Sequence, residues 1–92
     1  MKIQFILRGQ LKSLAQGASF DCEFEEAYDV RQAIIQFASK KGESFRNAVL
    51  SVDNDITPSI LIFCNGRQIY SDEFHPLEEG NEILLMLPIA GG

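Results

Sequence analysis

The chain has 92 residues, of which 46% are hydrophobic and 23% are charged, and its formal net charge is −5. This length and composition indicate one domain with a single core and exclude a disordered chain. The sequence shows neither a membrane-spanning stretch nor a signal-peptide pattern, so we expect a cytoplasmic protein. The acidic balance argues against nucleic-acid partners, because phosphate backbones would repel the chain, and favours a basic partner surface.

The first third of the chain predicts an antiparallel β-hairpin. Residues 1–8 and residues 19–25 both alternate between apolar and polar side chains, as half-buried strands do. The inward positions are Ile3, Phe5 and Leu7 in the first strand and Phe20, Cys22 and Phe24 in the second. Between the strands, residues 9–17 contain Leu11 and Leu14 and predict a turn that tucks apolar groups inward.

An amphipathic helix is predicted from residue 29 to residue 41. Asp29 stands three residues before Gln32, which is the spacing of an N-terminal capping box. One apolar stripe at helical spacing follows, formed by Val30, Ala33, Ile34, Phe37 and Ala38. Two lysines in the last turn suit the helix dipole, and Gly42 is placed to end the helix. Residues 43–50 predict either a short second helix or an extended lead-in.

The second half of the chain predicts three more strands. After a polar loop at residues 51–59, a continuous apolar run ending at residue 64 predicts a strand buried on both faces. Asn65-Gly66 is a strong hairpin signal, so residues 67–70 should fold back as a short edge strand. A further loop leads to a final strand at residues 82–88. This order predicts an α+β sheet crossed by one main helix, with the first and last strands side by side in the middle.

The last residues of the chain are Gly91 and Gly92. We expect Gly92 to be the natural terminus, with residues 89–92 forming a flexible tail after a domain of residues 1–88. Two residues without Cβ beside a free carboxylate would fit a narrow enzyme tunnel. Chain ends are also often glycine-rich without a function. The position of the dipeptide directly after an apolar strand favours a reactive terminus.

Other familiar kinds of site are not indicated. Two cysteines are too few for an iron–sulfur cluster, which needs four ligands, and without an export signal they are expected to be reduced. His75 lacks the nucleophile and orienting carboxylate of a catalytic arrangement. No glycine-rich phosphate loop is present, so the chain should not bind ATP by itself. We expect no metal site.

In the order of its motifs, the chain resembles the small ubiquitin-like sulfur carriers, above all the small subunit of molybdopterin synthase. The matching segments are the leucine-containing segment 9–14, residues 43–46 after the helix, the strand and turn 62–67, Pro76-Leu77, Gly80-Asn81-Glu82 and residues 87–92. The segment after the helix favours the molybdopterin branch over the shorter thiamine carriers. Asn81 departs from the commoner Asp, and the tail has one proline where many members have two.

The resemblance implies a ubiquitin-like β-grasp fold with a mixed sheet of four to five strands, and a definite chemistry. An E1-like partner would adenylate the carboxylate of Gly92, next to Gly91, and a persulfide would displace AMP to leave a thiocarboxylate. ATP and Mg²⁺ would be used by that partner, so this chain would bind no cofactor. It would be a carrier rather than an enzyme, acting as the non-catalytic small subunit beside the large subunit of molybdopterin synthase. In the β-grasp strand order, Cys22 and Cys64 would lie about 14 Å apart, too far for a disulfide.

A partner-binding strip is expected on the sheet face that the helix does not cover. Its predicted members are Ile6, Leu84, Met86 and Pro88, continued by Ile89 and Ala90 in the tail. The alternative is that some of these residues are simply core, but one helix covers only one face of a sheet.

Three other functions stay open at this point. The chain could carry sulfur for thiamine, cysteine or tRNA thiolation. It could be a ubiquitin-like modifier conjugated through Gly92. It could also be a non-covalent interaction domain whose glycines do nothing. In each case we expect a monomer or a heteromer with its partner.

Overall fold

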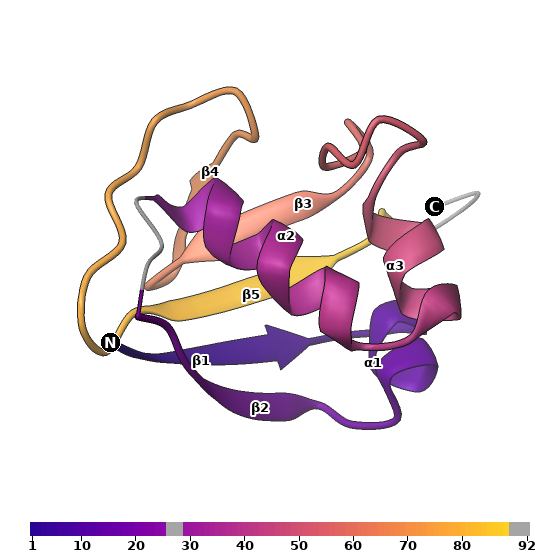
Figure 1. Ribbon diagram of the computed structural model, residues 1–92, viewed down its shortest axis with the longest axis horizontal. Helices are drawn as coiled ribbons and strands as arrows, with labels where there is room; N and C mark the ends of the chain where they lie inside the picture. The colour runs from indigo at the N-terminus through magenta and orange to yellow at the C-terminus, as the bar shows by residue number, and fades with distance from the viewer. Residues whose placement is uncertain (26–28, 89–92) are drawn as a thin grey trace.

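The computed structural model describes residues 1–25 and 29–88, and over these residues it forms one five-stranded sheet with helices packed against it (Figure 1). The strands are β1 (Lys2–Leu7), β2 (Ser19–Glu23), β3 (Leu61–Cys64), β4 (Arg67–Ile69) and β5 (Glu82–Met86). The helices are α1 (Gln10–Ala15), α2 (Val30–Lys40) and α3 (Glu43–Val49).

The strands follow the order β2-β1-β5-β3-β4. The neighbouring inner strands β1 and β5 run parallel, and the other neighbours run antiparallel, so the sheet is mixed. α2 crosses one face of this sheet (Figure 1). This is the α+β, β-grasp arrangement predicted from the sequence, with the first and last strands in the middle. No helix in the described ranges is long and apolar enough to cross a membrane.

The segment between β1 and β2 is a helix, and the predicted turn is wrong. Leu11 of α1 is fully buried, and Leu14 packs against the core from a partly buried position. α1 begins after Gly9 and ends at Gln16, both of which have a positive φ of 58°. Six residues are too few to display a helical period in the sequence, so only the burial of the leucines was predictable.

α2 forms as its sequence predicts. The Asp29 carboxylate accepts a hydrogen bond from the backbone N–H of Gln32 at 2.8 Å, which satisfies one of the free donors at the helix start. The five stripe residues are all buried. The helix ends at Lys40, and Gly42, with a φ of 95°, turns the chain into α3. Residues 43–50 therefore take the first of the two predicted forms, a short helix.

Replacing the helix cap should weaken the fold measurably. Asp29→Ala removes the acceptor for the Gln32 N–H and is expected to lower the free energy of unfolding by about 1 kcal/mol. Asp29→Asn keeps an acceptor oxygen and should cost only a fraction of that. Urea denaturation followed by circular dichroism measures both, with Asp53→Ala in an exposed loop as the control. Equal stability of Asp29→Ala and Asp53→Ala would contradict this role for the cap.

Aromatic rings fill the space between α2 and the sheet. The rings of Phe5 in β1 and Phe37 in α2 stack with centroids 4.1 Å apart and planes 4° from parallel. Phe45 of α3 meets Phe37 edge-on at 5.6 Å, and Phe20 of β2 lies 5.7 Å from it. Phe37 is therefore the residue through which two strands and two helices share one core.

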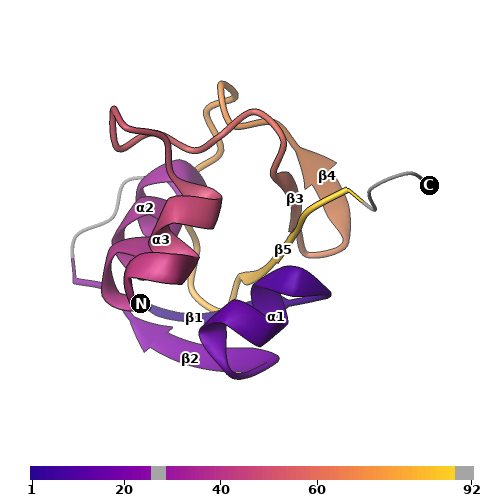
Figure 2. The same ribbon diagram turned by 90° about the vertical axis from the view of Figure 1, so that its right-hand side faces the viewer.

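β3 is buried on one face only, and the prediction of burial on both faces is wrong. Ile62 and Cys64 are buried, whereas Leu61 and Phe63 are partly exposed on the other face. Within residues 1–25 and 29–88, no helix lies over that face of β3, and its apolar residues remain partly in solvent (Figure 2). The hairpin to β4 is as predicted, with Asn65-Gly66 at positive φ values of 51° and 84°, the backbone of a type I′ turn.

Candidate functional site

Two asparagines fix the position of the central strand β5. Asn81, which is 6% exposed, accepts a hydrogen bond from the Glu78 N–H with its side chain at 2.7 Å. Its carbonyl accepts from the Gln4 N–H at 3.0 Å. On the other side, the Asn65 side chain accepts from the Glu82 N–H at 2.8 Å, and the Asn65 N–H donates to the Glu82 carbonyl at 2.8 Å. β5 is thus held in register from both neighbours.

This register puts alternate side chains of β5 on opposite faces. Ile83 and Leu85 are fully buried beneath the helices, whereas Leu84 and Met86 are only partly buried on the other face. Leu84 pairs in register with Ile6 of β1 on one side and with Phe63 of β3 on the other. Paired residues of neighbouring strands share a face, so apolar side chains from three strands meet there.

We call this set the open-face patch. It consists of Ile6, Leu61, Phe63, Leu84 and Met86, all partly exposed, together with the exposed Pro88 that follows β5. Figure 2 shows α2 and α3 on one side of the curved sheet, and neither of them lies over the other side of β3 and β5. A contiguous apolar surface on an uncovered sheet face is typical of a protein-binding surface.

A pocket of about 290 Å³ opens within the open-face patch. Its lining is Arg8, Phe63, Gly66, Glu82, Leu84 and Met86. The lining combines apolar side chains with the charged side chains of Arg8 and Glu82, which are both exposed. An inserted apolar side chain from a partner would be buried there, while the two charges would fix its orientation.

The structure brings most of the predicted strip together. Ile6, Leu84 and Met86 lie on the uncovered face, as the sequence predicts. Pro88 is exposed after the end of β5. Leu61 and Phe63 were missed because their strand was predicted to be buried on both sides. Alternation against the buried Ile62 and Cys64 is the signal that could have found them. The other predicted site residues, Ile89, Ala90, Gly91 and Gly92, lie outside the described residues, so their roles stay predictions.

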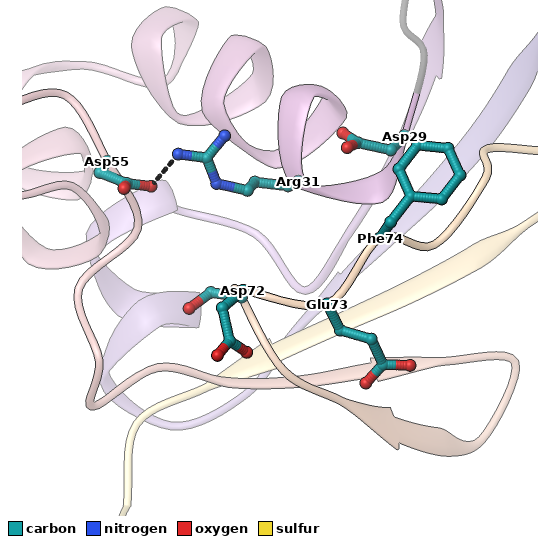
Figure 3. A pocket seen from close by; sticks show the side chains of 7 residues that line it. Asp29, Arg31, Asp55, Asp72, Glu73 and Phe74 are labelled. Atoms are coloured by element: carbon teal, nitrogen blue, oxygen red, sulfur yellow. Dashed lines mark hydrogen bonds and ion pairs between the residues drawn. The ribbon is translucent and has the colours of Figure 1, made fainter.

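A second pocket, of about 370 Å³, lies beside the start of α2 (Figure 3). Arg31 and Asp55 form an ion pair across it at 2.6 Å. A hydrogen bond from the Ile56 N–H, and then the bond from Arg31, hold the pKa of Asp55 below its usual range. Asp29 in the same pocket serves as the helix cap. These carboxylates have structural partners, and among the described residues no group of three or more His, Cys, Asp or Glu converges to hold a metal ion.

Neither cysteine has the surroundings of a reactive thiol. Burial raises the pKa of both the Cys22 and the Cys64 thiol, so both are protonated near neutral pH and are poor nucleophiles. Both thiols are free, and β1 and β5 separate their strands in the sheet. Cys64 is buried as predicted, whereas Cys22 is partly exposed at the edge of the core.

The sequence matches no protein-family model and no curated protein. The structure resembles SAMP1 from Haloferax volcanii with a TM-score of 0.86 and 17% identity over 100% of both chains. It resembles Urm1 from Trypanosoma brucei with a TM-score of 0.75 and 13% identity over 99% of this chain and 95% of that one.

A chain in the complex of subunits 1 and 2 of the molybdopterin-converting factor from Helicobacter pylori is also similar. Its TM-score is 0.56 at 22% identity, over 100% of both chains. At these identities the likeness is one of fold. The chain therefore has the ubiquitin-like β-grasp fold, as the resemblance of its sequence motifs implies.

Proposed function

We propose that this chain is a sulfur carrier whose Gly92 carboxylate is adenylated by an E1-like enzyme and converted to a thiocarboxylate that donates sulfur in molybdopterin biosynthesis. The observation that carries the proposal is the position of the open-face patch beside β5, the strand whose chain continues into Gly91 and Gly92. An enzyme that holds the patch would have the tail next to it. Fully extended, the stretch from Leu87 to Gly92 would span about 20 Å, enough to enter a neighbouring active site.

Activation would take place in the partner, in three steps. A carboxylate oxygen of Gly92 attacks the α-phosphorus of ATP and releases pyrophosphate, leaving an acyl adenylate. The terminal sulfur of a persulfide then attacks the carbonyl carbon, forms a carbon–sulfur bond and displaces AMP. A second thiol attacks the inner sulfur of the persulfide, so the original sulfur–sulfur bond breaks, a disulfide forms between the two thiols, and the thiocarboxylate is released. A free carboxylate needs this activation because its leaving group would be oxide. ATP and Mg²⁺ are held by the E1-like enzyme, and this chain contributes the reacting terminus.

The small-subunit role has separate support. The structurally similar chain from Helicobacter pylori belongs to a complex with a second subunit. By analogy, the large subunit of molybdopterin synthase would hold the open-face patch after the E1-like enzyme has released it, since both partners need the same tail. In this proposal the chain is non-catalytic, works in the cytoplasm and forms a heteromer with each partner in turn.

A second candidate function is protein modification through Gly92. It is favoured by the likeness to SAMP1, which has the highest TM-score of the three reported structures and is described as a small archaeal modifier protein. In that case the activated Gly92 carbonyl would be attacked by a lysine amine of a target rather than by sulfur. Both functions need the same terminus and the same activating step.

Intact-mass measurement of the protein purified from its native host tests the proposal. We expect a fraction of the molecules to carry one sulfur in place of one oxygen at Gly92. Deletion of Gly92, or addition of one alanine after it, should abolish this exchange because the carboxylate is then displaced. Val52→Ala, at a loop side chain that is 99% exposed, is the control and should retain it. Branched peptides ending in Gly92 would favour the modifier, and a molybdopterin supply that survives the Gly92 deletion would exclude the carrier role.

A further inference from the structure

β2 leaves one side of its backbone open. It pairs with β1 and lies at an edge of the sheet that the described residues form. The Leu7 N–H donates to the Ala18 carbonyl at 2.8 Å, and the Phe24 N–H donates to the Met1 carbonyl at 2.8 Å. Hydrogen-bonded pairs alternate along an antiparallel ladder, so the backbone groups of Asp21 point away from β1. An edge of this kind can template one more strand.

A groove runs beside this edge, between β2 and α2. A pocket of about 280 Å³ lies in it, lined by residues of β2 and its end, including Cys22 and Phe24, and by residues of α2, including Phe37. Figure 1 shows β2 along one edge of the sheet and α2 crossing the face of the sheet. A strand added to β2 would direct every second side chain into this groove, where apolar side chains would meet apolar walls.

Two lysines make the rim of the groove basic. Lys40 and Lys41 both line the pocket, although the chain as a whole carries a net charge of −5. The Lys41 ammonium lies 3.6 Å from the centroid of the Phe20 ring, a cation–π contact that holds it at this edge. Glu23 also lines the pocket, and its carboxylate lies 3.7 Å from the N-terminal ammonium, which offsets its charge. The rim therefore favours acidic side chains in a ligand.

From these three features we propose that the groove between β2 and α2 is a docking site for an extended segment of a partner protein, apolar in its centre and flanked by acidic residues. The segment would pair with β2 through its backbone and place its acidic side chains beside Lys40 and Lys41. A second copy of this chain suits the edge poorly, because pairing through β2 would bring Asp21 and Glu23 of both copies together. The site is separate from the open-face patch and does not depend on the chemistry of Gly92.

Titration of the ¹⁵N-labelled protein with synthetic octapeptides tests this inference. The probes are a set whose central residues vary among valine, isoleucine and leucine and whose ends are aspartates. A matched set ends in lysines. We expect the aspartate set to shift the amide resonances of residues 19–25 and 36–41 and the lysine set to bind weakly. Absence of binding by every probe, shifts confined to the open-face patch, or self-association without peptide would each overturn the proposal.

Two variant pairs locate the contact. Lys40→Glu should weaken binding about tenfold, whereas Lys12→Glu, the same charge change in α1 away from the groove, should leave it unchanged. Asp21→Pro removes the outward N–H of the edge and should abolish binding. Gln68→Pro does the same at the β4 edge and should have no effect. If the spectrum of Asp21→Pro shows that this variant does not fold, the test rests on the comparison of Lys40→Glu with Lys12→Glu. Equal peptide affinities of these two variants would refute the site.

Discussion

Phe37→Ala is expected to lower the free energy of unfolding by about 3–5 kcal/mol, a large share of the 5–15 kcal/mol that stabilises a typical domain. The Phe37 side chain is 3% exposed and contacts the rings of Phe5, Phe20 and Phe45. Its removal leaves a cavity between α2 and the sheet that the stacked Phe5 ring cannot fill. Guanidinium denaturation measured by fluorescence and circular dichroism gives the difference in free energy.

Phe74→Ala is the matched control, because it deletes the same side chain where it is 70% exposed. We expect a change within about 0.5 kcal/mol there. Phe37→Leu keeps much of the volume and should lose less than Phe37→Ala. If both alanine variants lost the same small amount, the aromatic cluster would not be the centre of the core.

The fold could be predicted where an element is long enough to show its own period. α2 displays three turns of apolar stripe behind a capping aspartate, and β1 and β2 alternate over most of their length. α1 has only six residues, and its leucines fit a turn as well as a helix. The sequence therefore predicted that the leucines are buried but not that the segment is helical, because the packing of so short a helix is a tertiary effect.

The candidate site was only partly predictable for a related reason. Ile6, Leu84 and Met86 stood out because they break the expected alternation in central strands that a helix can cover on one face only. Leu61 and Phe63 lie in a continuous apolar run, which is equally consistent with a strand buried on both faces. Their exposure depends on which elements lie above β3, and that is decided by the whole fold rather than by the strand.

The register of β5 connects the buried core with the candidate site. Asn65 and Asn81 hold its start, and the pairing that follows places Leu84 between Ile6 and Phe63. A shift of one residue would turn Leu84 inward and Leu85 outward. The open-face patch and the core are therefore set by the same hydrogen bonds, and a change at Leu84 can disturb the patch while the inward side chains keep their packing.

Leu84→Asp should lower kcat/KM for adenylation by the cognate E1-like enzyme by about 30-fold or more, because a charge at the centre of the patch would cost about 2 kcal/mol or more of partner binding. ATP–pyrophosphate exchange with the purified enzyme measures this rate. Leu84 is only partly buried, so the variant should stay folded, and its thermal unfolding checks that it does.

Asn47→Asp provides the matched control, since it adds the same charge at an exposed position of α3, on the other side of the sheet (Figure 2). Its exchange rate should equal that of the wild type. A folded Leu84→Asp protein that is adenylated at the wild-type rate would show that the enzyme does not hold the open-face patch. Recognition would then have to rest on another surface, with the tail alone reaching the nucleotide. A rate that falls for Leu84→Asp but not for Asn47→Asp would instead tie activation of Gly92 to the open-face patch, which the register of β5 brings together.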